Sequence, residues 1–287
     1  MSKNIFINPP FNYTGSKYKL LPQILPEFDY SKKLMVDLFT GGGSVMYNCI
    51  DKFEVIIAND IIKPLMNIHY MMLTRPEYLI KRTKQVCALI KNKHSYNKVR
   101  QIFNDHNSHP ALLWALMLTC NSNMIRFNYQ MKFNQTCGLR NWNSSTDKKV
   151  FKLLEHLKKQ KINIKCISRE FYNVPIEWDE LKKIINLDID IKKAFYYIDP
   201  PYSNTHAGYN CFWTKKHDID LYEYILKLND YGHTFCLSGI LHHNNKESIL
   251  LTNLIKHGFN VVEIDADYNK VQNIKRGKVP EIIIKNF

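Results

Sequence analysis

Short apolar runs alternate with helical patterns near both ends of the chain. Close to the N-terminus, "LMVDLF" and "EVIIAND" are flanked by turn residues and predict buried strands, and "SVMYNCI" between them predicts the start of a helix. In the second half, further strands are predicted by "INIKCIS", "AFYYID", "HTFCLSG", "NVVEID" and "EIIIKNF". Two helical stretches between these runs, "IDLYEYILKLNDYG" and "KESILLTNLIKHG", each close on a glycine suited to a helix C-cap. The alternation predicts an α/β fold with a doubly wound, mostly parallel sheet.

The middle of the chain has a different pattern. From residue 65 to residue 161 the apolar positions follow helical spacing, and lysine and arginine are frequent. The stretch "NSNMIRFNYQMKFNQTCGLRNWNSS" interrupts this pattern, is rich in asparagine and aromatic residues, and predicts a hairpin or a long loop. We therefore expect residues 1–64 and 162–287 to form one catalytic domain, and residues 65–161 to form a helical insert that carries a β-hairpin.

The composition adds information about partners and compartment. The formal net charge of the 287 residues is +14, which favours a polyanionic partner such as nucleic acid, although a solvated basic surface would give the same value. The seven cysteines are scattered singly, without zinc spacing. With no hydrophobic leader and no apolar run long enough for a membrane span, the sequence favours a cytoplasmic protein.

The stretch "DLFTGGGSV" follows the first strand. Asp37 ends the strand, and Gly41 to Gly43 form a turn that permits positive φ and a close approach of backbone to ligand. Asp60 comes about 20 residues after this turn, at the end of the next strand, where a carboxylate can bind both hydroxyls of a ribose. The spacing is not GxGxxG and the turn has no Walker lysine, so it favours a nucleoside cofactor without a pyrophosphate over NAD or ATP. A tight structural turn is the alternative.

The stretch "DPPY" follows another buried strand. The carboxylate of Asp199 and the carbonyl of Pro200 are adjacent acceptors that suit the two hydrogens of one exocyclic amino group. Tyr202 offers a ring on which a planar base can stack. Holding both N–H groups of an adenine returns the lone pair to N6, which assists attack on a methyl donor without a metal.

In this order the motifs resemble those of the Dam-type N6-adenine DNA methyltransferases, which use S-adenosylmethionine. The resemblance covers nearly the whole chain: "NYTGSKYKLLPQI" is similar to the N-terminal motif, "DLFTGGGSV" to the cofactor turn, "DPPY" to the catalytic motif and "EIIIKNF" to the last strand. It implies a Rossmann-like methyltransferase fold and site-specific methyl transfer to N6 of an adenine flipped out of double-stranded DNA. It also implies a protein without metal or membrane partner, monomeric or weakly dimeric.

The resemblance assigns roles by position. It places Asp199, Pro200 and Tyr202 on the target adenine, with Lys17 near the methionine end of the cofactor. "ISREF", residues 167–171, resembles a segment that contacts the adenine of the cofactor. The residues that the resemblance implies for the cofactor site as a whole are Tyr13, Thr14, Gly15, Lys17, Asp37, Phe39, Gly41, Gly43, Asp60 and Asp199.

The predicted hairpin resembles the recognition hairpin of the family in "SNMIRFN" and in the "FN" of "KFNQTCGLR". Arg126 stands where relatives read a guanine, and an arginine fork suits guanine O6 and N7, although a phosphate contact is the alternative. The other residues implied for DNA recognition are Ser122, Asn123, Met124, Asn128 and Thr136. The resemblance implies GATC as the expected target. Two departures from the GATC readers, at Asn121 and Thr136, fall in this hairpin and leave a related short site as the alternative.

Other features leave alternatives open. His242 and His243 favour a surface loop over a metal site, and no other residue supports Cys120 and Cys137 as a redox pair. Residues 209, 212 and 213 lie in a loop that either closes over the flipped base or packs. The rival functions are a cytosine-N4 or RNA adenine methyltransferase, a non-catalytic DNA-binding protein, and a methyltransferase for a small amine or protein glutamine; a companion restriction enzyme is left open.

Overall fold

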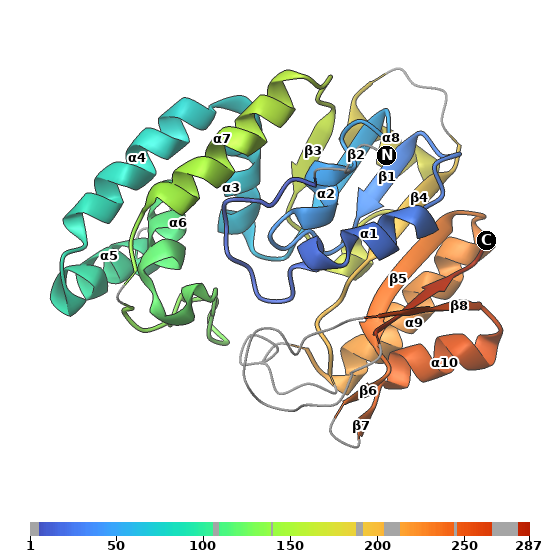
Figure 1. Ribbon diagram of the computed structural model, residues 1–287. Helices are drawn as coiled ribbons and strands as arrows, with labels where there is room; N and C mark the ends of the chain where they lie inside the picture. Colours follow the sequence, from blue (N-terminus) through green and yellow to red (C-terminus); the bar gives the residue numbers. More distant parts are fainter. Residues whose placement is uncertain are drawn as a thin grey trace.

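A computed structural model describes residues 6–105, 109–138, 140–187, 192–203, 213–243, 246–265 and 281–287 (Figure 1). Its helices are α1 (Leu21–Ile24), α2 (Ser44–Asn48), α3 (Lys63–Thr74), α4 (Pro76–Leu89), α5 (Lys93–Asp105), α6 (Pro110–Thr119), α7 (Ser144–Lys158), α8 (Trp178–Ile185), α9 (Lys215–Asp230) and α10 (Ile249–His257). Short 3-10 turns include η1 (Lys17–Lys19), η3 (Asn121–Asn123) and η4 (Phe171–Asn173).

The predicted α/β sheet is confirmed, and it has seven strands in the described chain. Their order is β3 (Ile164–Ile167), β2 (Val55–Asn59), β1 (Leu34–Asp37), β4 (Ala194–Ile198), β5 (Thr234–Ile240), β9 (Glu281–Lys285) and β8 (Asn260–Ile264). The first five strands are parallel, and β9 runs antiparallel to both β5 and β8. The carboxyl ends of β1, β2 and β4 therefore meet at one edge of the sheet, and the first residue of β9 reaches that same edge.

Alternating side chains of the strands fill two hydrophobic cores, one on each face of the sheet. On β1, Met35 is buried in one core and Leu34 and Val36 are buried in the other. Helices α8, α9 and α10 cover the second core, and α9 and α10 lie at the right of Figure 1. Burial of strands on both faces explains why the sequence shows continuous apolar runs where one-sided strands would alternate.

The first core extends without a break from the sheet into the helical middle of the chain. Trp114 of α6 and Leu153 of α7 belong to the same buried cluster as Met35. Helix α6 is almost wholly buried, with α3, α4 and α5 packed around it, at the left of Figure 1. The predicted boundary at residues 64 and 65 falls in the first turn of α3, and the boundary at 161 and 162 falls between α7 and β3. The insert and the sheet thus share one continuous hydrophobic core.

The structure adds elements that the sequence patterns did not reveal. Helix α8 lies in a stretch for which the apolar runs predicted nothing. The two histidines expected in a surface loop form β6 (His242–His243), which pairs with β7 (Lys246–Glu247). Among the described residues, no group of three or more His, Cys, Asp or Glu is arranged to hold a metal ion. Within the same residues, no helix combines the length and the apolar character needed to cross a membrane.

Candidate active site

Three aspartates lie at the shared carboxyl edge of the parallel strands. Asp37 is the last residue of β1, Asp60 follows β2 and Asp199 follows β4. Asp37 pairs in register with Tyr197, so two neighbouring strands end almost level. A cavity of about 440 Å³ opens at this edge, and all three aspartates line it.

The glycine turn is shaped by close packing as well as by backbone conformation. Gly41 and Gly43 have φ of 51° and 76°, in the left-handed region that favours glycine. A Cβ atom at Gly41 would lie 2.8 Å from the ring of Tyr13, and one at Gly43 would lie 2.9 Å from the rings of His69 and Tyr47. Both positions therefore require glycine, because φ is positive and because a Cβ atom would clash with a neighbouring ring. Gly43 itself does not line the cavity, whereas Gly41 does.

His69 supports this turn from below as a neutral ring. Its Nε2 donates to the carbonyl of Gly41 at 2.8 Å, and its Nδ1 lies 3.0 Å from the hydroxyl of Tyr47. Burial lowers the pKa of His69 to about 4, against the opposing effect of its backbone hydrogen bond. The ring is uncharged at neutral pH. It packs beneath the turn and links the carbonyl of Gly41 to the hydroxyl of Tyr47 through its two nitrogens.

Asp60 ties the glycine turn to the end of β2. One carboxylate oxygen accepts the N–H of Gly41 at 3.0 Å, and the other accepts the N–H of Ile62 at 2.9 Å. Burial raises the pKa of Asp60, and these two hydrogen bonds oppose the rise. Each oxygen retains a second lone pair, so the group can still accept from a ligand in the cavity.

Asp37 has a contrasting environment. Its side chain is 1% exposed, and neither carboxylate oxygen has a hydrogen-bond partner among the described residues. Burial raises its pKa well above the usual value, and the carboxylates of Asp199 and Asp60 raise it further. The nearby backbone amide of Met46 opposes this rise. An unsatisfied carboxylate facing a cavity indicates a site for a cationic group.

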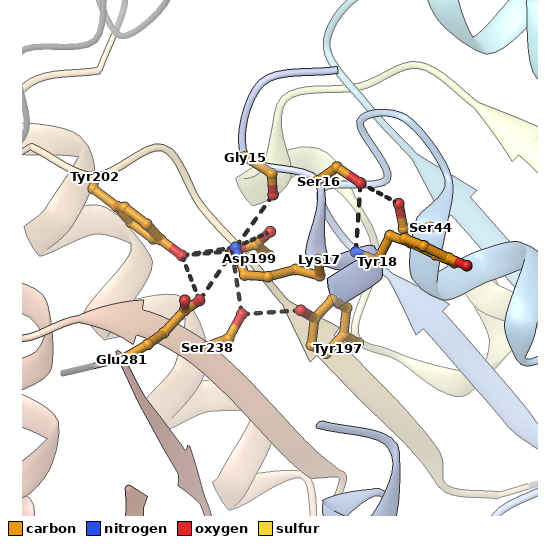
Figure 2. Close-up of polar contacts among 10 residues, drawn as sticks. All are labelled: Gly15, Ser16, Lys17, Tyr18, Ser44, Tyr197, Asp199, Tyr202, Ser238 and Glu281. Atoms are coloured by element: carbon orange, nitrogen blue, oxygen red, sulfur yellow. Dashed lines mark hydrogen bonds and ion pairs between the residues drawn. The ribbon is translucent and has the colours of Figure 1, made fainter. Parts of the chain in front are cut away.

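Asp199 is held by several donors at once (Figure 2). The ammonium of Lys17 lies 2.7 Å from Oδ1 and 2.9 Å from Oδ2, and the hydroxyls of Tyr202 and Ser238 donate to Oδ1 at 2.9 Å and 3.1 Å. Burial raises the pKa of Asp199, and Lys17 offsets part of that rise. Burial lowers the pKa of Lys17, but its carboxylate neighbours outweigh this and raise it, so the side chain stays charged.

A second buried carboxylate belongs to the same cluster and was not predicted. Glu281, the first residue of β9, is 0% exposed and lies 3.4 Å from the ammonium of Lys17. Its Oε1 is also 3.3 Å from the hydroxyl of Tyr202, as Figure 2 shows. The sequence contained a weak signal, because a charged residue directly precedes the three isoleucines of "EIIIKNF". That signal becomes meaningful only once β9 is known to run antiparallel, which brings its first residue to the active edge.

Three aromatic side chains form one wall of the cavity. Phe39, Phe171 and Trp213 contact one another with ring centroids 5.6 to 5.8 Å apart. All three line the cavity, and Phe171 comes from the "ISREF" segment. The wall is an apolar surface of the size that a planar base can cover.

Asp218 connects Ser203 with Trp213, which lie at the end of one described segment and the start of the next. It accepts a hydrogen bond from the hydroxyl of Ser203 at 2.5 Å and another from the indole N–H of Trp213 at 2.7 Å. Trp213 is thereby packed into the cavity wall. Tyr209 and Phe212 lie outside the described residues.

The predicted recognition hairpin lies over the same cavity. Its pairing consists of two isolated antiparallel bridges, Cys120 with Cys137 and Phe127 with Phe133. Side chains alternate along its first arm. Ile125 and Phe127 are buried and line the cavity, while Met124 and Arg126 are exposed. The cysteines that the sequence left without support as a pair are thus direct neighbours at the base of the hairpin, both present as free thiols.

The remaining hairpin residues differ in their environments. Ser122 is exposed with φ of 56°, Asn123 lies beside it in η3, and Thr136 is exposed on the second arm. Asn128 shapes the tip, because its side-chain oxygen accepts the N–H groups of residues 130 and 132. That oxygen is already used within the turn.

The predicted site residues therefore fall into two groups. The cavity is lined by Tyr13, Thr14, Gly15, Lys17, Asp37, Phe39, Gly41, Asp60, Asp199, Pro200 and Tyr202. Gly43 and the six recognition residues lie outside its lining. The hairpin residues that do line it, and that sequence reasoning did not single out, are Ile125, Phe127, Tyr129 and Met131.

Several characterised proteins are similar to this chain. The type II methyltransferase M.FokI of Planomicrobium okeanokoites is 28% identical over 298 residues, which cover 99% of this chain and 43% of that protein. The modification methylase StsI of Streptococcus sanguinis is also 28% identical, over 98% of this chain and 43% of its own length. The chain thus spans less than half the length of these two relatives. The type II methyltransferase M1.LlaDCHI of Lactococcus lactis subsp. cremoris is 25% identical, over 100% of this chain and 98% of that protein.

Similarity to solved structures is weaker. The rRNA methyltransferase aviRa from Streptomyces viridochromogenes matches 97% of this chain and 88% of its own, with 9% identity and a TM-score of 0.44, a value too low to support an inference about this chain. The family model of the D12 class N6 adenine-specific DNA methyltransferases matches residues 13–269. That match includes the glycine turn, the hairpin and the DPPY motif. The chain belongs to the D12 class of N6 adenine-specific DNA methyltransferases.

Proposed function

We propose that this chain transfers a methyl group from S-adenosylmethionine to N6 of an adenine that has been flipped out of double-stranded DNA. One observation carries the proposal. The glycine turn and the DPPY motif, far apart in sequence, line one cavity at the carboxyl edge of the sheet. A donor bound at the turn and an amine held by Asp199 would share that cavity, as direct transfer requires.

The cavity residues fit S-adenosylmethionine. The unsatisfied carboxylate of Asp37 suits the α-ammonium group of the cofactor, and a cation there would remove the cost of burying Asp37. Asp60 stands at the end of β2 with lone pairs for the ribose hydroxyls. The wall formed by Phe39 and Phe171 suits the adenine ring of the cofactor. The cofactor, when bound, supplies a methyl group on a positively charged sulfur.

Asp199 and Pro200 are proposed to hold the amino group of the target adenine. Each accepts one N6–H, and the nitrogen lone pair is then directed at the methyl group. The carbon–nitrogen bond forms as the carbon–sulfur bond breaks, with the bonding pair left on sulfur. Asp199 is the base nearest the proton that N6 must then lose, and its raised pKa favours receiving it. Tyr202 is proposed to stack on the base.

Binding of DNA is proposed to involve two kinds of contact. The net charge of +14 supports phosphate contacts that are independent of sequence. The exposed side of the hairpin, with Arg126 and Met124, supports contacts to base edges. The amino group of a paired adenine lies inside the duplex, so the base must leave the stack to reach a cavity at a sheet edge.

We further propose that residues 65–161 act as the target-recognition insert between the two parts of the catalytic domain. The relatives are named as type II methyltransferases or as a modification methylase, which supports a short, fixed DNA site for this chain also. GATC or a related short sequence is the proposed target.

The test is methyl transfer from labelled S-adenosylmethionine to unmethylated DNA, followed by sequencing that locates N6-methyladenine. We expect label in the adenine of one short motif, and a DNA premethylated at that motif provides the matched control. Label on cytosine N4 or in RNA would overturn the proposed substrate. Cofactor binding without transfer to any nucleic acid would favour a non-catalytic DNA-binding protein.

A further inference from the structure

One oxygen of the catalytic carboxylate is fully occupied in this structure. Each carboxylate oxygen offers about two lone-pair positions. Oδ1 of Asp199 receives Lys17, Tyr202 and Ser238, whereas Oδ2 receives Lys17 alone among the described residues. An adenine amino group can therefore bind Oδ1 only when one of these donors moves away.

Two of the three donors have a second anionic acceptor within reach. Glu281 lies 3.4 Å from the ammonium of Lys17 and 3.3 Å from the hydroxyl of Tyr202. The alternative for Ser238 is the hydroxyl of Tyr197 at 2.9 Å, which is neutral. Lys17 also approaches the carbonyl of Gly15 at 3.4 Å, but a carbonyl binds a buried ammonium more weakly than a carboxylate does.

Glu281 is well placed to receive those donors without moving itself. It opens β9, where it pairs in register with Ile240 of β5 on one side and with Ile264 of β8 on the other. Its side chain is completely buried. A carboxylate fixed between two strands can stabilise a displaced ammonium that would otherwise be buried without a partner, which is strongly unfavourable.

We propose that Glu281 is a positioning residue for methyl transfer. As the adenine amino group approaches Oδ1 of Asp199, Lys17 and the hydroxyl of Tyr202 shift their hydrogen bonds toward Glu281 and release an acceptor position on that oxygen. This inference rests on the proposed function, because it assumes that Asp199 holds the target adenine. It assigns to the last strand a part in the reaction that its position in the sequence does not suggest.

The proposal has an electrostatic consequence that can be measured. The titratable and charged groups around Asp199, from every element packed against it, are Lys17, Asp37, Tyr197, Tyr202 and Glu281. Removing the negative charge of Glu281 lowers the pKa of Asp199 and leaves Lys17 more firmly bound to it. The acid limb of the rate profile, which reports ionisation of Asp199, then moves to lower pH.

The experiment compares Glu281→Gln with the wild-type chain in steady-state methyl transfer across a range of pH. We expect kcat to fall about tenfold, with KM for the cofactor nearly unchanged, and the acid limb to shift to lower pH. Glu27→Gln is the matched control, because Glu27 also pairs with a lysine, Lys285 of β9, at 2.9 Å. That variant should keep the wild-type kcat and acid limb. A purely structural Glu281 would lower the melting temperature and leave kcat at the pH optimum unchanged.

A double-mutant cycle provides the second test. If Glu281 acts through Lys17, Glu281→Gln should lose most of its effect on kcat in a Lys17→Met background. If Glu281→Gln does not fold, Glu281→Asp keeps the charge and shortens its reach, and it should lower kcat without moving the acid limb. Wild-type kcat in a folded Glu281 variant would overturn the inference. A wild-type chain that methylates no DNA would instead overturn the proposed function.

Discussion

The buried edge of the sheet and the recognition hairpin lie close together but differ in burial and in rigidity of pairing. The edge consists of buried side chains held by strands, whereas the hairpin exposes one of its sides and has little strand pairing. At the edge, Asp199 and Glu281 are fixed by strands and held by a shared lysine that is itself only 5% exposed. The hairpin has two isolated bridges and presents Arg126 to solvent. The same hairpin contributes Ile125 and Phe127 to the cavity.

This difference separates two tasks that the protein is proposed to perform. Methyl transfer needs the carboxylates held in place before the chemical step, because their reorganisation during that step costs rate. Reading a DNA site needs exposed donors that can meet base edges and still adapt. The first arm of the hairpin takes part in both tasks, because its side chains alternate between two sides. The exposed side is proposed to contact DNA, and the buried side lines the cavity.

The largest expected effect is at Asp199. Asp199→Ala should lower the rate of methyl transfer by about 1,000-fold, because it removes the carboxylate proposed to hold the adenine amino group. Cofactor binding and the preference for one DNA site should remain. Single-turnover transfer and equilibrium DNA binding measure the two properties separately, and near-normal turnover would refute the mechanism.

The next largest effect concerns stability and cofactor binding, and it distinguishes the unsatisfied carboxylate of Asp37 from the hydrogen-bonded carboxylate of Asp60. Asp37 has a raised pKa in the folded chain, so its ionisation opposes folding as pH rises above the ordinary value of 3.8. Asp37→Asn should therefore raise stability at neutral pH by about 1–3 kcal/mol, with the gain vanishing in acid, where the wild-type carboxyl is protonated in both states. It should also weaken S-adenosylmethionine binding about tenfold, through the lost ion pair.

Thermal unfolding between acid and neutral pH and calorimetric binding of S-adenosylmethionine measure these two effects. Asp60→Asn is the matched control. Burial raises the pKa of Asp60 also, but its carboxylate accepts two backbone N–H groups, and because an amide oxygen can replace only one of those acceptors the variant should lower stability. Equal destabilisation by both variants would contradict the distinction between an unsatisfied and a satisfied carboxylate.

The smallest expected effect is in the hairpin. Arg126→Ala should reduce discrimination at one guanine by about 1–3 kcal/mol and leave transfer to the best site nearly as fast. Competition between cognate DNA and single-base variants measures this. Lys132→Ala removes another exposed charge from the same hairpin and should weaken all DNA alike. If Arg126→Ala also weakened binding to all DNA sequences equally, Arg126 would be a phosphate contact, and its role would not differ from that of Lys132.

Much of the edge could be predicted because its signals are local. A buried apolar run followed by glycines, or by Asp-Pro-Pro-Tyr, specifies a strand and the turn after it. Parallel strands then bring Asp37, Asp60 and Asp199 to one edge without any knowledge of packing. The cavity-facing side of the hairpin could not be predicted, because the side chains of its first arm alternate but no local signal in the sequence says which of the two sides meets the cavity.

The sequence by itself determined the order of the elements, the parallel sheet and the identity of the motifs at its edge, since periodicity and turn chemistry act over a few residues. Only the tertiary structure decided that Asp37 is unsatisfied while Asp199 receives three donors, although both lie at the carboxyl ends of neighbouring strands. It also brought Glu281, 82 positions after Asp199 in the chain, into contact with Lys17. Those outcomes depend on burial and on the reversed direction of β9, which arise when distant segments pack together.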